Sequence, residues 1–263
     1  MTTAQTCQRT VLITGASRRI GRVLAVDFAR RGWRIGIHFR RSRGEAEALA
    51  AQLRALGSEA EPLAADLAVT ADVASLVPRC RDALGAPSCL INNASEFHFD
   101  TATTMTPESW DVHLIVNLKA SVFLAQALSA HLPDGHEGHV INIIDQRAWR
   151  PTPEFFSYTV SKAGLWTATR MLAQALAPRV RVNAIGPGPA LPNIHQRVED
   201  FEAEKRSTLL RRGTSPEEIA AAVRFILDAP AMTGQMIALD GGQHLAWSNA
   251  QRPAFTPVAD SKR

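Results

Sequence analysis

An apolar run, a glycine-containing turn and a helical pattern follow one another near the N-terminus, and this succession most constrains the fold. Residues 10–14 (TVLIT) predict a buried strand, residues 15–21 the turn, and the helical pattern that follows stops at Gly32. Gly15 and Gly21 let the backbone approach a pyrophosphate, and the helix N-terminus offers free N–H groups to it. The turn therefore predicts a dinucleotide site, although an ordinary turn between strand and helix would contain the same glycines.

The rest of the chain continues the alternation of strands and helices. Further strands are predicted at residues 34–39, 61–65, 88–91, 139–144, 181–185 and 236–240. The chain has 263 residues, of which 46% are hydrophobic, and no composition break divides it. These features predict an α/β fold, a single Rossmann-type doubly wound parallel sheet of about seven strands flanked by helices, in one domain spanning residues 1–263.

Two segments of this domain differ in character from the rest. Residues 190–212 turn polar and charged, which predicts a mobile lid over a substrate. Residues 246–263 form a C-terminal tail that either docks on a neighbouring chain or frays. The helical pattern at residues 156–177 is apolar almost all round, which predicts burial on two sides and a homo-oligomer, either a dimer or a tetramer.

The second predicted strand ends in a basic segment. Sites that prefer NAD usually place an acid at this point to hold the ribose 2′-hydroxyl, and the segment contains none. Arg40, Arg41 and Ser42 instead supply guanidinium and hydroxyl donors that suit a 2′-phosphate. The segment predicts NADPH over NADH, unless it is only a basic loop.

Residues 145–162 are expected to carry the chemistry. Asp145 follows a predicted strand, at the sheet edge where open α/β folds bind ligands. Tyr158 and Lys162 are four residues apart and share one helix face, where an ammonium group lowers the pKa of a nearby phenol. Tyr158 is the only tyrosine in the chain. The pair can move a proton, although a Tyr and a Lys at this spacing often form a solvated surface.

Charge and histidine placement argue against two other classes of ligand. The net charge is +4, but the arginines are mostly scattered, which predicts one anionic ligand and no nucleic acid. His131, His136 and His139 flank a Pro/Gly loop without the acid or cysteine spacing of a zinc site, so no metal is expected.

Cysteine usage and the N-terminus indicate the compartment. Cys7, Cys80 and Cys89 are odd in number and form no C-x-x-C motif, which suits a reducing cytoplasm. Residues 1–9 are polar, and no uninterrupted apolar run reaches about 18 residues. Neither an export signal nor a membrane span is expected.

Motifs along nearly the whole chain resemble the short-chain dehydrogenase/reductase superfamily. They lie at Thr14, Gly15, Gly21, Asn92, Asn93, Ala94, Asn117, Tyr158, Lys162, Asn183, Gly186, Pro187 and Gly188. Within that superfamily the chain resembles pteridine reductases and the related bacterial dihydromonapterin and dihydrofolate reductases. Four features carry this closer likeness: Arg19, residues 38–42, the string from Asn92 to Phe97, and Asp145. The superfamily usually has a serine at the position of Asp145, whereas pteridine reductases have an aspartate.

The resemblance implies an NADPH-dependent reductase that transfers hydride to a C=N bond of a pterin or dihydropterin. It implies that Phe97 stacks the pterin against the nicotinamide, that Lys162 holds the nicotinamide ribose, and that Asn117 anchors a water chain. Expected cofactor contacts are Gly15, Ser17, Arg18, Arg19, Ile20, Gly21, His38, Arg40, Arg41, Ser42, Asp66, Leu67, Asn93, Ala94, Ser95, Lys162, Pro187 and Gly188. Expected substrate contacts are Arg19, Ser95, Phe97, Asp145, Tyr158 and Leu191. Asp66 could contact the adenine amine or cap the next helix.

Asp145 also makes chemical sense without the resemblance. A carboxylate disfavours tyrosinate and opposes Lys162, so Tyr158 should stay protonated as a proton donor. A carboxylate can also accept the N–H groups of an aminopyrimidine ring.

Two alternatives remain open. One is an NADPH-dependent carbonyl reductase for 3-oxoacyl thioesters or sugars, in which Ser157 or Ser161 replaces the missing serine. The other is a non-catalytic NADPH-binding regulator. Neither the natural pterin or folate nor the reduction step follows from the sequence.

Overall fold

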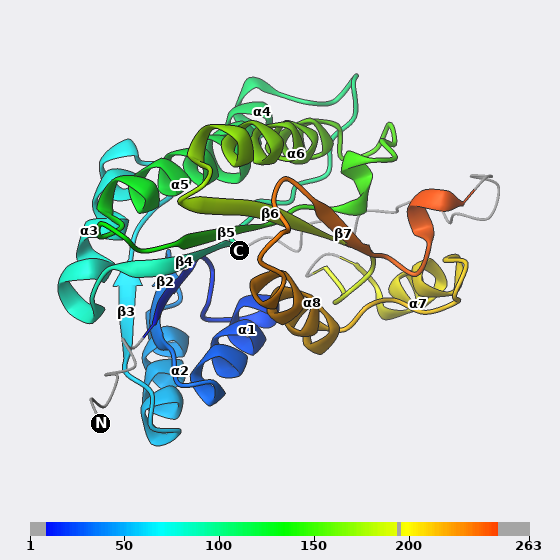
Figure 1. Ribbon diagram of the computed structural model, residues 1–263. Coiled ribbons are helices and arrows are strands. Elements are labelled where there is room, and N and C mark those ends of the chain that lie inside the picture. Colours follow the sequence, from blue (N-terminus) through cyan, green and yellow to red (C-terminus); the bar gives the residue numbers. More distant parts are fainter. Residues whose placement is uncertain (1–8, 194–195, 247–263) are drawn as a thin grey trace, which may run out of the picture.

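Seven parallel strands form one sheet in the computed structural model, which describes residues 9–193 and 196–246 (Figure 1). The strands are β1 (Thr10–Ile13), β2 (Arg34–Phe39), β3 (Ala60–Ala64), β4 (Pro87–Asn92), β5 (Gly138–Ile143), β6 (Val180–Pro187) and β7 (Met236–Leu239). Their order is β3-β2-β1-β4-β5-β6-β7. The order reverses between β1 and β4, and this confirms the predicted doubly wound Rossmann-type fold, whose ligand crevice opens at such a reversal.

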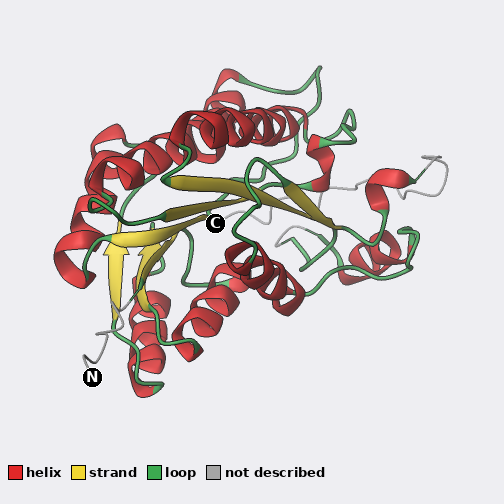
Figure 2. Ribbon diagram, in the orientation of Figure 1, coloured by secondary structure: helices red, strands yellow, loops and turns green. Residues whose placement is uncertain are grey.

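Helices cover both faces of the sheet (Figures 1 and 2). One layer consists of α1 (Arg19–Arg30), α2 (Arg43–Ala55) and α8 (Pro216–Asp228). The other consists of α3 (Thr70–Leu84), α4 (Pro107–His113), the π-helical segment η1 (Leu114–Lys119), α5 (Ala120–His131) and α6 (Phe156–Leu176). The helix α7 (Val198–Arg206) and the short 3₁₀ turns η2 (Gln146–Ala148) and η3 (Gln243–Leu245) lie outside the two layers.

The core is divided by the sheet into two apolar clusters. In β1, Val11 and Ile13 face the α1 side, where Phe28 lies, and Leu12 faces the α3 side with Leu76. All these side chains are buried. A strand alternates its side chains between the two faces, so a strand with helices on both sides must be apolar throughout. This burial explains why the strands appear in the sequence as continuous apolar runs.

One helical segment, Pro107–His131, is long and apolar enough to cross a membrane by length and composition. The mean hydropathy of its 18-residue window is 1.4, and 44% of that window is buried inside the fold. The segment packs against α3 and α6 over the sheet. Core helices of layered α/β folds meet the same criterion, because they are buried on the sheet side and beside their neighbours.

Candidate active site

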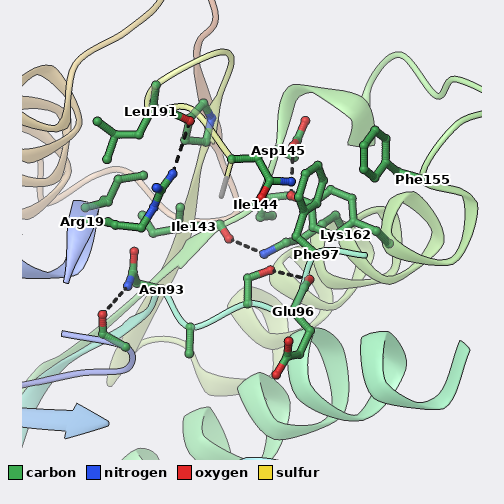
Figure 3. A pocket seen from close by; sticks show the side chains of 18 of the residues that line it. Arg19, Asn93, Glu96, Phe97, Ile143, Ile144, Asp145, Phe155, Lys162 and Leu191 are labelled. Atoms are coloured by element: carbon green, nitrogen blue, oxygen red, sulfur yellow. Dashed lines mark hydrogen bonds between the residues drawn. The ribbon is translucent and has the colours of Figure 1, made fainter. Parts of the chain in front are cut away.

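A cavity of about 670 Å³ opens at the carboxyl ends of the strands (Figure 3). Most of the residues expected at the cofactor and substrate sites line it: Gly15, Arg18, Arg19, Ile20, His38, Arg40, Asp66, Leu67, Asn93, Ala94, Ser95, Phe97, Asp145, Tyr158, Lys162, Pro187, Gly188 and Leu191. Ser17, Gly21, Arg41, Ser42 and Asn117 do not. The fold therefore brings residues from six strand ends and the predicted lid into one cavity.

The glycine turn after β1 is held in a fixed shape. The Asn93 side-chain amide donates to the carbonyls of Thr14 (2.8 Å) and Gly15 (3.2 Å), and the Thr14 hydroxyl accepts from the backbone N–H groups of Asn93 and Ala94 (both 2.9 Å). Gly15 has a φ of +63°, and a Cβ on Gly21 would lie 2.3 Å from the Gly15 carbonyl oxygen. Only glycines permit this backbone, which fits the pyrophosphate of a dinucleotide beside the N-terminus of α1.

His38 supports this turn from the end of β2. Its Nδ1 accepts from the backbone N–H of Gly15 (2.9 Å), so Nε2 carries the proton and donates to the Ala65 carbonyl (3.1 Å). Burial lowers the pKa of His38 to about 4, which keeps the ring neutral at physiological pH. Both nitrogens are bound to backbone. The role of His38 is to join the glycine turn to β2 and to the residue after β3.

Of the basic segment after β2, Arg40 lines the cavity. Arg40 pairs with Glu96, and Arg18 pairs with Glu45. The Ser17 and Ser42 hydroxyls contact each other at 2.7 Å. Guanidinium groups and hydroxyls gathered at one end of a dinucleotide cavity fit a phosphate.

Asp66 lines the same end of the cavity. Its Oδ1 accepts from the backbone N–H of Ala68 (2.9 Å), while the N-cap of α3 is Val69. The alternative that Asp66 caps α3 is therefore wrong, because its carboxylate turns the chain before the helix begins. The adenine contact of Asp66 stays a prediction.

Tyr158 lines the cavity together with Asp145 and Lys162, and the last two are labelled in Figure 3. The Tyr158 hydroxyl donates to Oδ2 of Asp145 at 2.9 Å, and Oδ1 of Asp145 accepts from the backbone N–H of Arg147 at 2.8 Å. Lys162 donates to the Ile143 carbonyl at 2.9 Å.

Burial, followed by the charge of Asp145, raises the pKa of Tyr158 well above 10. Burial lowers the pKa of Lys162 to about 8, although Asp145 opposes this shift. A protonated phenol can donate a proton to a substrate, and the carboxylate to which it is hydrogen-bonded can pass a replacement proton to it.

The first turn of α6, which carries Tyr158, is capped from a distant loop. Its N-cap residue Phe155 has a left-handed backbone (φ 55°) and makes no capping bond. The Asp100 carboxylate accepts from the backbone N–H (3.1 Å) and the hydroxyl of Ser157 instead. The Ser157 hydroxyl also contacts Nδ1 of His113 at 2.7 Å. All three side chains are buried, and they fix the position of the turn that presents Tyr158.

Neither serine that was considered as a substitute for the missing one is available. Ser157 is engaged by Asp100 and His113, and the Ser161 hydroxyl donates to the Tyr158 carbonyl at 2.7 Å. Neither residue lines the cavity. A carbonyl substrate would therefore meet Asp145, which accepts hydrogen bonds, where a reductase of that kind needs a donor.

Asn117 lies in the π-helical segment η1. Its Oδ1 accepts from the Glu96 N–H (2.9 Å), and its Nδ2 donates to the Glu96 carbonyl (3.0 Å) and to the Ser161 hydroxyl (3.1 Å). The extra residue per turn in a π-bulge re-aims a side chain. Asn117 thereby holds the loop after β4 against α6, and its role with a water chain stays a prediction.

Phe97 projects from that loop into the cavity (Figure 3). Its ring stacks on Phe155 with centroids 4.4 Å apart and planes 8° apart, and its edge meets Tyr158 at 4.5 Å. Phe99 packs edge-on against Phe155 at 5.2 Å. Phe97 thus lies beside the proton donor with one face stacked on Phe155, whereas Phe99 packs on the N-cap residue of α6.

Arg147 is the main residue of the site that the sequence did not reveal. It is only 7% exposed, lines the cavity, and places its guanidinium 5.2 Å from the centre of the Phe155 ring. Its Nη1 lies 3.5 Å from Oδ2 of Asp145. The only available signal was its place two residues after Asp145 at a strand end, which does not indicate the direction of the side chain. Other missed lining residues are Gln146, Gln196, Glu204 and Gln243.

Arg19 connects the glycine turn to the predicted lid. It adopts a positive φ of 52°, and its guanidinium donates to the carbonyls of Pro192 (2.9 Å) and Leu191 (3.3 Å) (Figure 3). Residues 190–212 contain α7. From this segment Leu191, Gln196 and Glu204 line the cavity.

Comparison with known proteins places the chain in a family. A model of the family described as "short chain dehydrogenase" matches residues 9–203. The chain is a short-chain dehydrogenase. Among curated relatives of this short-chain dehydrogenase, a putative ketoacyl reductase of granaticin polyketide synthase from Streptomyces violaceoruber is 34% identical over 242 residues, covering 89% of this chain and 95% of the relative.

Two solved structures resemble the short-chain dehydrogenase more closely in sequence. FolM alternative dihydrofolate reductase 1 from Brucella suis, in complex with NADP, is 46% identical with a TM-score of 0.89, covering 93% of this chain and 98% of the other. Its counterpart from Brucella canis, complexed with NADP, is 46% identical with a TM-score of 0.87, covering 92% and 96%. The enzyme class and the fold expected from the motifs are thereby confirmed.

Proposed function

We propose that this short-chain dehydrogenase is an NADPH-dependent reductase that transfers hydride to a C=N bond of a pterin or dihydropterin. The observation that carries the proposal is the hydrogen bond from Tyr158 to Asp145 at 2.9 Å, in a site whose lining includes neither Ser157 nor Ser161. A C=N bond accepts a proton on nitrogen as it is reduced, which a phenol backed by a carboxylate can supply. The 46% identity to two structures named as dihydrofolate reductases supports the same substrate class.

The residues of the site divide the work of binding and proton transfer. NADPH, when bound, supplies the hydride. The glycine turn holds the pyrophosphate, and Lys162 donates to the nicotinamide ribose and keeps positive charge near the phenol. Tyr158 donates its proton to the substrate nitrogen, and Asp145 accepts the hydrogen bond from the phenol and passes on a replacement proton, directly or through water. Phe97 supplies an apolar face on which a flat ring stacks.

The choice of NADPH over NADH follows from the adenosine end of the cavity. Arg40 lies there with Arg18, and the Ser17 and Ser42 hydroxyls are close by. Among the cavity-lining residues at the ends of β2 and β3, the only acid is Asp66, whose Oδ1 is occupied by the backbone. Guanidinium groups bind a 2′-phosphate in bidentate fashion, whereas a ribose hydroxyl calls for an acid. NADP in both Brucella structures supports this choice.

The proposal also includes a moving lid, an oligomeric state and a cellular compartment. Residues 190–212 close over the substrate as a lid, and Arg19 holds their first turn. The molecule is a homo-oligomer, either a dimer or a tetramer, that uses the apolar surface of α6, where Met171 is 64% exposed. It works in the cytoplasm, in agreement with the free buried thiols of Cys80 and Cys89. The predicted tail at residues 246–263 lies almost wholly outside the described residues.

The test compares substrates in the wild type and in Asp145→Ser. NADPH oxidation is followed by absorbance with dihydrobiopterin, dihydromonapterin, dihydrofolate and an acetoacetyl thioester. We expect turnover of a dihydropterin by the wild type and a loss of about 10²- to 10⁴-fold in kcat in Asp145→Ser, the usual contribution of general acid–base catalysis. Turnover of the thioester alone, retained or increased in Asp145→Ser, would instead identify a carbonyl reductase.

A further inference from the structure

Arg147 is a buried cation with donors that the protein leaves unused. Its only side-chain hydrogen-bond contact within the described residues is the 3.5 Å approach of Nη1 to Asp145, and its Nε is buried without a partner. A guanidinium group has five N–H donors, and leaving them unpaired in a buried site is costly. Because Arg147 lines the cavity beside Tyr158 and Asp145, a bound ligand is the natural acceptor for these donors.

The charges around Arg147 define what kind of acceptor it can take. Asp145, Glu204 and Glu154 are the acids that act on it, and together with Tyr158 they raise its pKa although burial acts in the opposite direction. Asp145 lies 3.5 Å from Nη1 as its counter-charge, and Glu154 and Glu204 line the same cavity. A further anionic group on the ligand would be repelled by them, so a neutral oxygen such as a ring carbonyl fits better than a carboxylate or phosphate.

The guanidinium group and the proton donor meet at one atom. Oδ2 of Asp145 accepts from the Tyr158 hydroxyl at 2.9 Å and lies 3.5 Å from Nη1 of Arg147. A ligand nitrogen at the Tyr158 hydroxyl therefore has the next atom on the same edge of its ring within reach of Arg147. In a pteridine, the oxygen on C4 lies beside N5 on the same edge, so two neighbouring acceptors would face two neighbouring donors.

We propose that Arg147 is a substrate-binding residue that donates to the C4 carbonyl oxygen of the pteridine while Tyr158 faces N5, and that it selects 4-oxo over 4-amino pteridines. This inference rests on the proposed function and deepens it. It assigns the reduced bond to the N5 side of the ring. A 4-amino group would direct its own N–H donors at the guanidinium group, leaving both sets of donors unpaired.

Binding of two matched ligands tests the assignment. The dissociation constants of a 6-substituted 2-amino-4-oxopteridine and of its 2,4-diamino counterpart are measured by titration calorimetry, on enzyme saturated with NADP⁺. In Arg147→Met, which keeps an unbranched apolar stem but removes the donors, we expect the 4-oxo ligand to bind about ten- to a hundredfold more weakly, as for a lost hydrogen bond to a charged group. The 2,4-diamino ligand should bind equally well or more tightly.

Two further variants keep the test decisive. Arg147→Lys retains the positive charge beside Asp145 but lacks the planar fork, so it should show an intermediate loss for the 4-oxo ligand. Arg22→Met, on the outer surface of α1 where Arg22 bonds Gln52, should bind both ligands as the wild type does. Binding of NADP⁺ by each variant reports that it is folded.

The outcomes separate this inference from the proposed function. If the wild type reduces a dihydropterin but the Arg147 variants lose affinity for both ligands equally, or for neither, Arg147 does not contact C4 and the inference is wrong while the function stands. If the wild type neither binds a pteridine nor reduces one, both are wrong. A selective loss for the 4-oxo ligand in Arg147→Met, with reduction intact in the wild type, would establish both.

Discussion

At the scale of single residues, three buried side chains near Asp145 determine the chemistry of the site: Tyr158, Lys162 and Arg147. The phenol of Tyr158 and the ammonium of Lys162 were predicted together from their spacing on one helix face, and their meeting with Asp145 followed from its place at a strand end. Arg147 could not be predicted in the same way, because the residues after a strand follow no fixed period and the direction of a side chain there depends on tertiary contacts. Phe155 escaped notice for the same reason, since a left-handed phenylalanine has no sequence signature.

The ionisation of Lys162 should limit activity at alkaline pH. Burial lowers its pKa from 10.5 to about 8, so the ammonium is mostly charged at neutral pH and is lost as the pH rises through about 8. Because kcat/KM reports groups of the free enzyme, kcat/KM for NADPH should decline above about pH 8. Lys162→Arg keeps its charge throughout this range and should give a lower but flat profile. A wild-type profile that stays flat to pH 10 would contradict the assignment.

Arg40 should determine the preference for NADPH. Replacing it in Arg40→Ala removes charge-assisted hydrogen bonds worth about 1.5–3 kcal/mol, so KM for NADPH should rise by about ten- to a hundredfold. KM for NADH, which lacks the phosphate, should change little and serves as the internal control. Steady-state kinetics with the two cofactors measure this directly. An equal rise for both would mean that Arg40 acts on the adenosine or on the loop that contains Glu96.

At the scale of elements, some helix ends carry a local signal in the sequence and others carry none. Thr106 and Pro107 mark the start of α4, and the structure has a capping box at Thr106 with Pro107 in the first turn. The start of α6 has no such signal, since Asp100 caps it from a loop 57 residues away. The π-bulge at Asn117 could not be predicted from the sequence, because a polar residue within an apolar helix must find partners without revealing which ones.

Asp100→Asn should weaken both the fold and the catalytic turn. The amide retains one acceptor but places N–H donors against the backbone N–H or hydroxyl of Ser157, which should lower the free energy of unfolding by about 1–3 kcal/mol. Chemical denaturation measures this loss, and kcat should fall because Tyr158 lies in the same turn. Thr106→Ala removes a cap from α4 alone and should cost about 1 kcal/mol with kcat unchanged. Equal effects of both variants on kcat would argue against a positioning role for Asp100.

At the scale of the whole molecule, the alternation of strands and helices was sufficient to predict the sheet and the edge at which ligands bind. Right-handed crossovers and burial on both faces leave few other arrangements for such a pattern. The contacts that cross the cavity could not be obtained this way. Arg19 and Pro192 are 173 residues apart, and their hydrogen bond depends on how the segment after β6 folds back over the glycine turn.

Arg19→Met should loosen the proposed lid at residues 190–212. Losing hydrogen bonds to the Leu191 and Pro192 carbonyls should make opening of residues 190–212 easier by about 1 kcal/mol, or about fivefold in population. Limited trypsin digestion should then cleave faster after Lys205 and Arg206, and KM for the dihydropterin should rise. Arg22→Met, a substitution on the same helix but away from the cavity, should digest as the wild type does. Unchanged cleavage in Arg19→Met would show that other contacts hold the segment.

Because Tyr158 is the only tyrosine among 263 residues, the protein contains its own optical probe of the catalytic centre. The near-ultraviolet absorbance change that accompanies formation of tyrosinate can arise from no other side chain. Because burial and Asp145 raise the pKa of Tyr158 well above 10, this signal should stay absent while the folded protein is titrated to that pH. Its appearance at a lower pH would contradict the assignment of Tyr158 as a protonated donor, and a ligand that lowers the pKa of the phenol would reveal itself by the same absorbance, without labels or turnover.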